Sequence, residues 1–289
     1  MIHATRKLEG IVYAFLTSLI WGSSFIFIKL SMMDVSAITY TAVRSLVSLA
    51  VLSPFLLRRY VVGLFDKTSF MHGLTIGVSY ALGLFLQADG TKYISPSTSA
   101  FITGLNTLHV HLYYATVKKS YNLFDALSLS LAVSGLYMLT GPTGELNTGA
   151  LMVFLGSIAW GAQIILVSRY SRGSMLETLG GMFLAGSLLF PLVPVMERTE
   201  LSSEALVYLS YLAIFCSLVA SFFQVLAQRY ISAKSAATIY LLEPVFALLF
   251  SLVAGMEGLN PYKLIGGGLI SIATYVVILQ ESKSRSVSN

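Results

Sequence analysis

Long apolar stretches, separated by short polar connections, run through almost the whole chain. Each stretch holds about 20 residues or more, the length that a helix needs to cross the hydrocarbon core of a bilayer. Because the connections are short, consecutive helices are expected to lie side by side and antiparallel. The pattern predicts ten spanning helices, at about residues 8–31, 35–57, 70–88, 95–117, 122–141, 147–168, 175–196, 205–228, 234–255 and 261–280.

Two stretches of this pattern occur twice. Residues 85–102 (FLQADGTKYISPSTSAFI) match residues 222–239 (FFQVLAQRYISAKSAATI) at an offset of 137. Upstream, residues 10–22 match residues 149–161 at an offset of 139. Each half would then contain five helices, and because five is odd, the second half must insert with the opposite orientation. Inverted repeats of this kind are common in alternating-access transporters.

The two halves meet at residues 141–148 (GPTGELNT), where Gly and Pro favour a short turn. We expect a first repeat at 1–144, an inverted second repeat at 145–281 and a polar cytoplasmic tail at 282–289. The expected fold is therefore an all-α integral membrane protein with ten transmembrane helices in two inverted five-helix repeats.

Composition supports a membrane protein without a soluble domain. Hydrophobic residues make up 56% of the chain and charged residues 11%, whereas a soluble domain carries about a quarter charged residues. The mean hydropathy is +0.78. The single cysteine, Cys216, lies in an apolar stretch and is expected to be a buried packing thiol without a disulfide.

The positive charges predict the orientation of the chain. With the N-terminus in the cytoplasm, thirteen Lys and Arg residues fall on the inner side, and four (Lys29, Lys92, Arg198 and Lys263) fall on the outer side. This positive-inside bias predicts that both termini lie in the cytoplasm. The expected location is the plasma membrane. The net charge of +5 is thus an orientation signal and not a nucleic-acid-binding face.

Few ionisable side chains lie far from the ends of the predicted spans. Each is a candidate site residue, because a charge at mid-membrane costs about 2.5–3.5 kcal/mol on insertion scales. Arg44 is either a structural cation bonded to carbonyls or a partner for an anion. Glu243 either caps amides freed near Pro244 or binds a proton or an amine. His109 lies on the same helix face as Asn106, whereas His111 points away.

Polar and aromatic residues at matched positions of the two halves, such as Gln87 and Gln224, extend this polar face to other spans. A polar stripe either holds helices together or lines a wet cavity, and the matched positions favour a cavity. The predicted cavity residues are Trp21, Gln87, Asn106, His109, Trp160, Gln163, Gln224, Tyr240 and Glu243, with Arg44 as a candidate charge partner.

Several motifs of enzymes are missing from the sequence. There is no G-x-x-x-x-G-K-[ST] loop for nucleotide hydrolysis and no H-E-x-x-H or Cys/His cluster with metal-ligand spacing. We therefore expect neither an enzyme nor a cofactor or metal site.

Four segments together resemble the EamA family of the drug/metabolite transporter superfamily. They are WGSSFIFIK (21–29), AVRSLVSLA (42–50), LQADGTKYISPSTSAFITGL (86–105) and SAATIYLLEPVFALLF (235–250). The resemblance implies ten helices in two inverted repeats, alternating access and a central cavity lined by spans one, three, four, six, eight and nine. After residue 105 the family usually continues with apolar residues and a Pro, whereas here residues 106–111 read NTLHVH. This departure points to a polar or ionisable substrate.

The expected function is secondary transport of a small organic metabolite, such as an amino acid, amine or nucleobase, with export favoured over uptake. The partners would be this solute and the lipid bilayer, with proton coupling through a titrating His109 as a further hypothesis. One alternative is a translocase of a lipid or lipid-linked sugar, with a cavity open sideways to lipid. Another is an intramembrane enzyme that uses His109 and Glu243 as acid and base.

Overall fold

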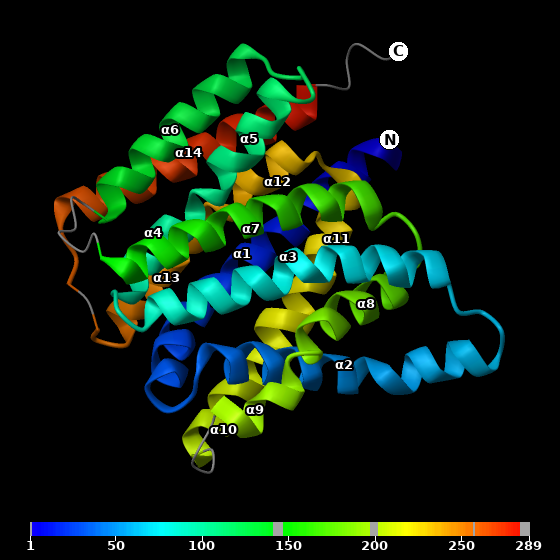
Figure 1. Cartoon of the computed structure of the whole chain (residues 1–289). Coiled ribbons are helices and arrows are strands. Elements are labelled where there is room, and N and C mark those ends of the chain that lie inside the picture. Colours follow the sequence, from blue (N-terminus) through cyan, green and yellow to red (C-terminus); the bar gives the residue numbers. More distant parts are fainter. Residues whose placement is uncertain (1, 141–146, 197–201, 257, 284–289) are drawn as a thin grey trace.

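The chain folds into helices that lie across one another in several layers (Figure 1). The junction at 141–146 and the tail from 284 onward lie outside the described residues. Throughout the described part of the chain every regular element is a helix, and no strand occurs there. The computed structural model describes residues 2–140, 147–196, 202–256 and 258–283.

Six helices precede the junction and the others follow it. The first group is α1 (Ile2–Asp34), α2 (Ala37–Val61), α3 (Lys67–Thr91), α4 (Pro96–Gly104), α5 (Asn106–Thr116) and α6 (Leu123–Thr140). The second group is α7 (Thr148–Tyr170), α8 (Met175–Ser187), the 3-10 helix η1 (Phe190–Leu192), α9 (Val193–Met196), α10 (Ser203–Tyr211), the π-helix η2 (Leu212–Val219), α11 (Ala220–Tyr230), α12 (Ala233–Tyr240), α13 (Leu242–Val253) and α14 (Pro261–Lys283).

Eight helical segments within the described ranges are long and apolar enough to cross a membrane. The predicted fourth and fifth spans do not meet this measure: α4 and α5 are separate short helices, and α6 is a shorter apolar helix. The polar side chains of Asn106, His109 and His111 make α5 less apolar than its neighbours. The eight segments are Arg6–Asp34, Ala37–Val61, Lys67–Thr91, Thr148–Tyr170, Met175–Val195, Ser203–Tyr230, Ala233–Val253 and Pro261–Glu281.

Both copies of the Tyr-Ile-Ser sequence end one helix and begin the next. The Ser95 hydroxyl accepts the Thr98 amide at 3.2 Å and caps α4. The Ser232 hydroxyl accepts the Ser235 amide at 3.1 Å and caps α12. A serine at this position satisfies one of the first amides of a helix, which have no partner within the helix. The duplicated sequence therefore produces the same local structure twice.

A second pair of helix breaks follows these caps. The α-helical hydrogen-bond pattern is interrupted at Leu105, between α4 and α5, and at Leu241, between α12 and α13, although both residues keep right-handed helical dihedral angles. The second break puts Pro244 in the first turn of α13, where its missing amide hydrogen does not interrupt the helix. The two breaks place Asn106 and Glu243 at or next to the start of a helix in the centre of the molecule.

Glycines bring α3 and α8 into direct backbone contact. A Cβ atom on Gly73 would lie 2.0 Å from the Thr178 carbonyl oxygen, and one on Gly77 would lie 2.4 Å from the Met182 carbonyl oxygen. Small residues permit such close approach, on which helix association in membranes depends. At the opposite edge of the molecule, α6 and α14 lie side by side (Figure 1).

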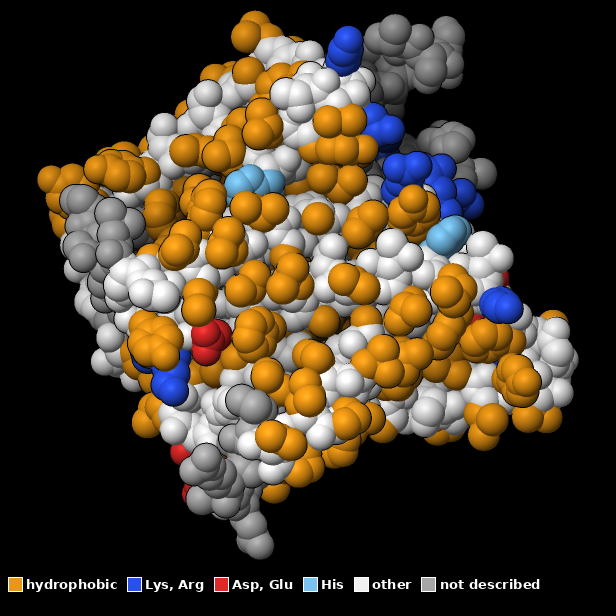
Figure 2. Space-filling model, viewed as in Figure 1, with side chains coloured by type: hydrophobic (Ala, Val, Ile, Leu, Met, Phe, Trp, Pro, Cys, Tyr) orange, Lys and Arg blue, Asp and Glu red, His pale blue; other side chains and the backbone are white. Residues whose placement is uncertain are grey.

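The surface matches a protein surrounded by lipid. In Figure 2, hydrophobic side chains cover most of the visible face, and most of the visible Lys and Arg side chains lie toward the end where α1 begins and α14 ends. Large exposed hydrophobic residues occur on many helices, including Phe55, Leu123 and Tyr275. A soluble monomer rarely exposes such a continuous apolar surface.

Candidate functional site

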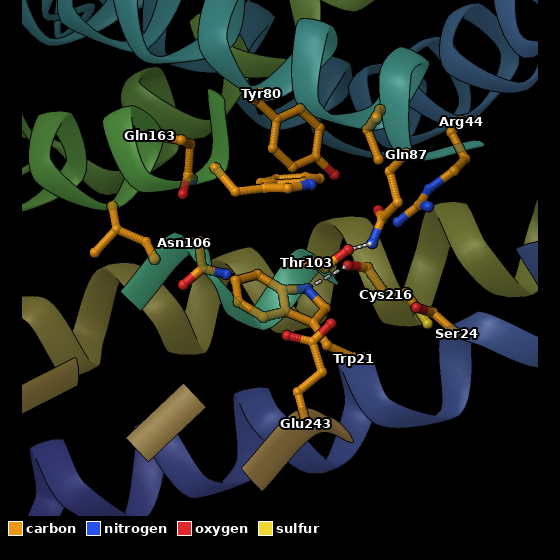
Figure 3. A pocket seen from close by; sticks show the side chains of 13 residues that line it. Trp21, Ser24, Arg44, Tyr80, Gln87, Thr103, Asn106, Gln163, Cys216 and Glu243 are labelled. Atoms are coloured by element: carbon orange, nitrogen blue, oxygen red, sulfur yellow. Dashed lines mark hydrogen bonds between the residues drawn. The ribbon is translucent and has the colours of Figure 1, made fainter. Parts of the chain in front are cut away.

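A small cavity lies in the centre of the bundle, between helices from both parts of the chain (Figure 3). The unfilled space between its lining atoms is at most about 430 Å³ when open solvent is counted. The lining residues come from α1, α2, α3, α4, α5, α7, η2 and α13. They are Trp21, Ser24, Arg44, Tyr80, Leu84, Gln87, Thr103, Asn106, Trp160, Gln163, Ile164, Cys216 and Glu243.

The structure brings most of the residues expected at a cavity to this one place. Six of the nine predicted residues line the cavity, together with Arg44. Three others, His109, Gln224 and Tyr240, lie elsewhere. The six are Trp21, Gln87, Asn106, Trp160, Gln163 and Glu243.

His109 is turned toward α7 and away from the cavity. Its Nε2 atom lies 3.1 Å from the Ser157 hydroxyl, and its ring meets Phe154 edge to face. Although Asn106 and His109 lie on one face of α5, His109 is one turn farther along, where α7 already packs closely at Gly161. At this position His109 does not line the cavity.

Gln224 and Tyr240 support lining residues from behind. The Gln163 amide donates to Gln224 Oε1 at 2.9 Å, and Gln224 donates back to Gln163 Oε1 at 2.8 Å. Both glutamines are fully buried. Tyr240 packs edge to face on Trp21, with 5.3 Å between ring centroids. These residues are positioned to hold Gln163 and Trp21 in place.

The glutamine pair leads to a testable stability prediction. Gln224→Leu should destabilise the protein by about 1–3 kcal/mol, because it leaves the buried Gln163 amide without a partner. Replacing both glutamines by leucine should restore most of that loss, since no buried amide then remains. Thermal unfolding in detergent measures both effects. A double variant no more stable than Gln224→Leu would contradict this account.

The matched tryptophans of the two sequence copies meet at the cavity. The Trp21 and Trp160 ring centroids are 6.3 Å apart. Trp21 is held by a hydrogen bond of 3.0 Å from its Nε1 atom to the Cys216 carbonyl oxygen. Trp160 packs edge to face on Tyr80, and a Cβ atom on Gly83 would lie only 2.8 Å from its indole. The aromatic part of the cavity wall is thus tightly fitted.

Arg44 reaches the cavity from α2 and is almost completely buried. Its Nε atom donates to the Ser217 hydroxyl at 2.9 Å, and Nη1 donates to the Tyr40 hydroxyl. The guanidinium also lies over the Tyr40 ring, 5.1 Å from its centroid. The expected carbonyl partners are replaced by hydroxyls. Among the described residues no carboxylate forms an ion pair with Arg44.

Glu243 lies in the first turn of α13, is 7% exposed and lines the same cavity. Within the described ranges, no hydrogen bond or ion pair joins its carboxyl group to another residue. No side chain caps the start of α13, so the capping role considered from the sequence is not what the structure shows. Among the described residues, the carboxyl group therefore faces the cavity without a protein partner.

Neutral polar groups complete the lining. Gln87 donates to the Thr103 hydroxyl at 3.0 Å and so links α3 to α4. Asn106 Oδ1 accepts a long hydrogen bond of 3.3 Å from the Thr107 hydroxyl. In the part of the chain that the structure describes, no group of three or more His, Cys, Asp or Glu side chains is close enough to hold a metal ion.

Six lining residues were not among the predicted cavity residues, and the sequence holds a signal for some of them. Tyr80 and Leu84 lie seven and three residues before Gln87, on the same face of α3. Cys216 carries no such signal, because it lies in the π-helix η2, where the helical phase changes. Cys216 is a free, buried cysteine, as expected; it also lines the cavity, and its backbone carbonyl accepts the hydrogen bond from Trp21. The other three are Ser24, Thr103 and Ile164.

The sequence matches a transporter family and one protein named as a transporter. The model of the EamA-like transporter family matches residues 8–141 and again residues 147–279. A protein of Archaeoglobus fulgidus named as an uncharacterized transporter is 29% identical over 271 residues, which cover 92% of this chain and 84% of that protein. A crystal structure with 18% sequence identity superposes with a TM-score of 0.75 over 96% of this chain and 99% of the other. At this identity, the superposition shows a shared fold alone.

Proposed function

This chain belongs to the EamA-like transporter family, and on that premise we propose that it moves a small organic solute across a membrane by alternating access. Its apolar helices make it a multi-pass membrane protein. The observation that carries the proposal is the central cavity, where Arg44, Asn106 and Glu243 converge from three different helices. Polar groups at this depth are costly unless they serve a pathway for a solute or ion.

We propose ten membrane-crossing segments, with α4–α5 and α6 as the fourth and fifth, arranged as two inverted repeats at 1–144 and 145–281. The two matches of the family model support this division. The packing supports it too, because equivalent helices of the two halves make equivalent contacts. In the first half α1 lies against α11 and α13 of the second, and in the second half α7 lies against α3 and α5 of the first. Alternating access would follow if the two repeats rock about the cavity between them.

We also propose that both termini face the cytoplasm across the plasma membrane. The predicted positive-inside bias supports this orientation, as does the grouping of Lys and Arg toward one end in Figure 2. The proposed solute is an amino acid, amine or nucleobase, because the cavity combines aromatic walls with amide, carboxyl and guanidinium groups. The proposed direction is export.

Solute flux tests the proposal. A screen for metabolites that raise the melting temperature of the purified protein identifies ligands. Liposomes containing the protein should then take up such a ligand with saturable kinetics. Both Asn106→Leu and Glu243→Leu should reduce this flux at least about tenfold, since each removes a polar group of the cavity.

The matched control is Glu204→Gln, which removes an exposed carboxylate of α10 that does not line the cavity and should leave flux unchanged. Normal flux in both Asn106→Leu and Glu243→Leu would remove the cavity assignment. Absence of saturable flux for every ligand found would contradict the transport function itself.

A further inference from the structure

The three ion pairs among the described residues have two features in common. Each joins a helix of the first half to a helix of the second half. Each cation is one of the thirteen basic residues that the sequence places on the cytoplasmic side. The pairs are Lys7–Glu281, Arg59–Glu177 and Lys234–Asp125. On the proposed cytoplasmic side, the two halves are therefore held together by opposite charges.

The pair between α12 and α6 is well enclosed. Lys234 Nζ lies 2.5 Å from Asp125 Oδ2 and donates to the Ser120 carbonyl oxygen at 2.9 Å. It also lies 5.8 Å from the ring centroid of Tyr114 and 5.6 Å from that of Tyr121. The two charged side chains are only 12% and 6% exposed. Removing either partner would leave the other buried and unpaired, which is costly while this side stays closed.

The end of α14 connects this pair to a second one. Gln280 Nε2 donates to Asp125 Oδ1 at 3.4 Å, and the Ser235 hydroxyl donates to Glu281 Oε1 at 2.5 Å. Glu281 is also the partner of Lys7, at 3.2 Å. These contacts lie at the end of the molecule where α1 begins and α14 ends (Figure 1). They form one continuous polar network between the halves.

A separate pair closes α2 against α8. Glu177 is fully buried, and its Oε1 atom accepts a hydrogen bond of 2.5 Å from Arg59 Nε. Its Oε2 atom accepts the Ser174 hydroxyl. The Ser174 amide in turn donates to the Ser69 hydroxyl of α3 at 2.9 Å, which is a further contact between the halves. A buried carboxylate with this many partners requires the two halves to stay together.

The sequence repeat lacks an equivalent of the enclosed lysine on the opposite side. With identical copies, the conformations open to either side would be related by exchanging the copies and would have equal energy. Here Ser97 stands in the first copy where Lys234 stands in the second. On the opposite side, two exposed hydrogen bonds join the halves, Asn147–Tyr93 and Ser202–Asp34. The Lys234 pair therefore favours the conformation that is closed on the cytoplasmic side.

From these contacts we infer that the Lys234–Asp125 and Arg59–Glu177 pairs form a latch that keeps the central cavity closed to the cytoplasm. The inference rests on the inverted repeats and the alternating access proposed above. Opening toward the cytoplasm separates the halves, so the latch must break and its charges become hydrated. Neutralising one partner then destabilises the closed conformation alone, because the remaining charge is desolvated only there.

The native Cys216 can report opening of the cavity from each side. It is the only cysteine of the chain, lines the cavity and is fully buried. A charged methanethiosulfonate reagent does not cross the bilayer, so it reaches Cys216 only through an open side of the cavity. The reagent is added to inside-out membrane vesicles or to intact cells, and mass spectrometry of the purified protein gives the rate of modification. For the native protein we expect a slower reaction from the cytoplasmic side.

Variants that neutralise one partner should open the cytoplasmic side. In inside-out vesicles, Lys234→Gln and Asp125→Asn should each raise the rate of Cys216 modification by about tenfold or more, because the open conformation gains population. In intact cells the rate should not rise. Lys118→Gln is the matched control, since it neutralises an exposed cation on the same proposed side, and it should leave both rates unchanged.

Two further variants separate the latch from a general loss of stability. Combining Lys234→Asp with Asp125→Lys exchanges the charges and should bring the cytoplasmic rate back toward the native value. Arg59→Gln breaks the second pair, whose arginine side chain is 36% exposed, and should also raise the cytoplasmic rate. This variant tests the latch even if the substitutions at the enclosed pair prevent folding.

Four results would overturn the latch. The native protein would react faster from the cytoplasmic side; Lys234→Gln, Asp125→Asn and Arg59→Gln would all react at the native rate; the rates would rise equally from both sides; or they would rise in intact cells alone. Each of these results would leave the transport function standing, because that function is tested by solute flux. Absence of flux would remove the transport function even if Cys216 reacts as expected.

Discussion

Gly181→Ala is expected to lower the stability of this protein by about 2 kcal/mol or more, although the same change stabilises most helices. A Cβ atom at Gly181 would lie 2.0 Å from the Phe70 carbonyl oxygen and 2.8 Å from the Leu74 amide nitrogen. Both are backbone atoms of α3, so no side-chain rotation relieves the clash. The two helices must separate, and overpacking of this kind costs about 1–3 kcal/mol or more.

Gly268→Ala on α14 is the matched control, because a Cβ atom there would meet no atom within 4 Å. The added methyl group should raise stability slightly, since alanine is favoured over glycine within a helix by about 0.5–1 kcal/mol. Thermal unfolding in one detergent compares the two variants. Equal stability of Gly181→Ala and Gly268→Ala would show that α3 and α8 do not make this backbone contact.

Cysteines introduced at the two copies of Tyr-Ile-Ser should be labelled from opposite sides of the membrane. The only native cysteine, Cys216, is fully buried, so background labelling by a membrane-impermeant maleimide should be low. In intact cells, Tyr93→Cys should react, because its position is 56% exposed and is proposed to face outward. Tyr230→Cys should react only after the membrane is permeabilised, because inverted repeats place matched residues on opposite sides.

Lys118→Cys, at an exposed position after α5, is the control for the inner side and should behave like Tyr230→Cys. The expected difference is all or none, since the reagent does not cross the bilayer. Labelling of Tyr93→Cys and Tyr230→Cys from the same side would rule out the inverted arrangement, and with it the mechanism in which the two repeats rock about the cavity.

Hydrophobic pattern was sufficient for the long apolar helices, but not for the breaks within the predicted fourth and ninth spans. The serine caps at Ser95 and Ser232 follow from sequences that occur twice, since a cap depends on the serine and the amides of the next turn. The matched positions also led to the cavity. Trp21 and Trp160 lie beside each other, although 139 residues separate them in the chain.

Partners of the buried polar groups could not be predicted in the same way. Gln87 and Gln224 occupy matched positions, yet Gln87 lines the cavity and Gln224 lies behind Gln163. The sequence also does not reveal that hydroxyls, and no carboxylate among the described residues, hold Arg44. Arg44 and Ser217 are 173 positions apart and Gln163 and Gln224 are 61 apart, so no local rule relates these partners.

The sequence by itself determined that this protein is helical, lies in a membrane and belongs to a transporter family, because hydrophobic length, caps and repeats are properties of short stretches. The tertiary structure decided which polar residues face one another. It interrupts two helices at Leu105 and Leu241, places a π-helix around Cys216, and brings Arg44 and Glu243 to one cavity, where neither forms an ion pair with a described residue. The physical reason is that the side chains lining the cavity depend on how the helices pack against one another, and not on whether each helix forms.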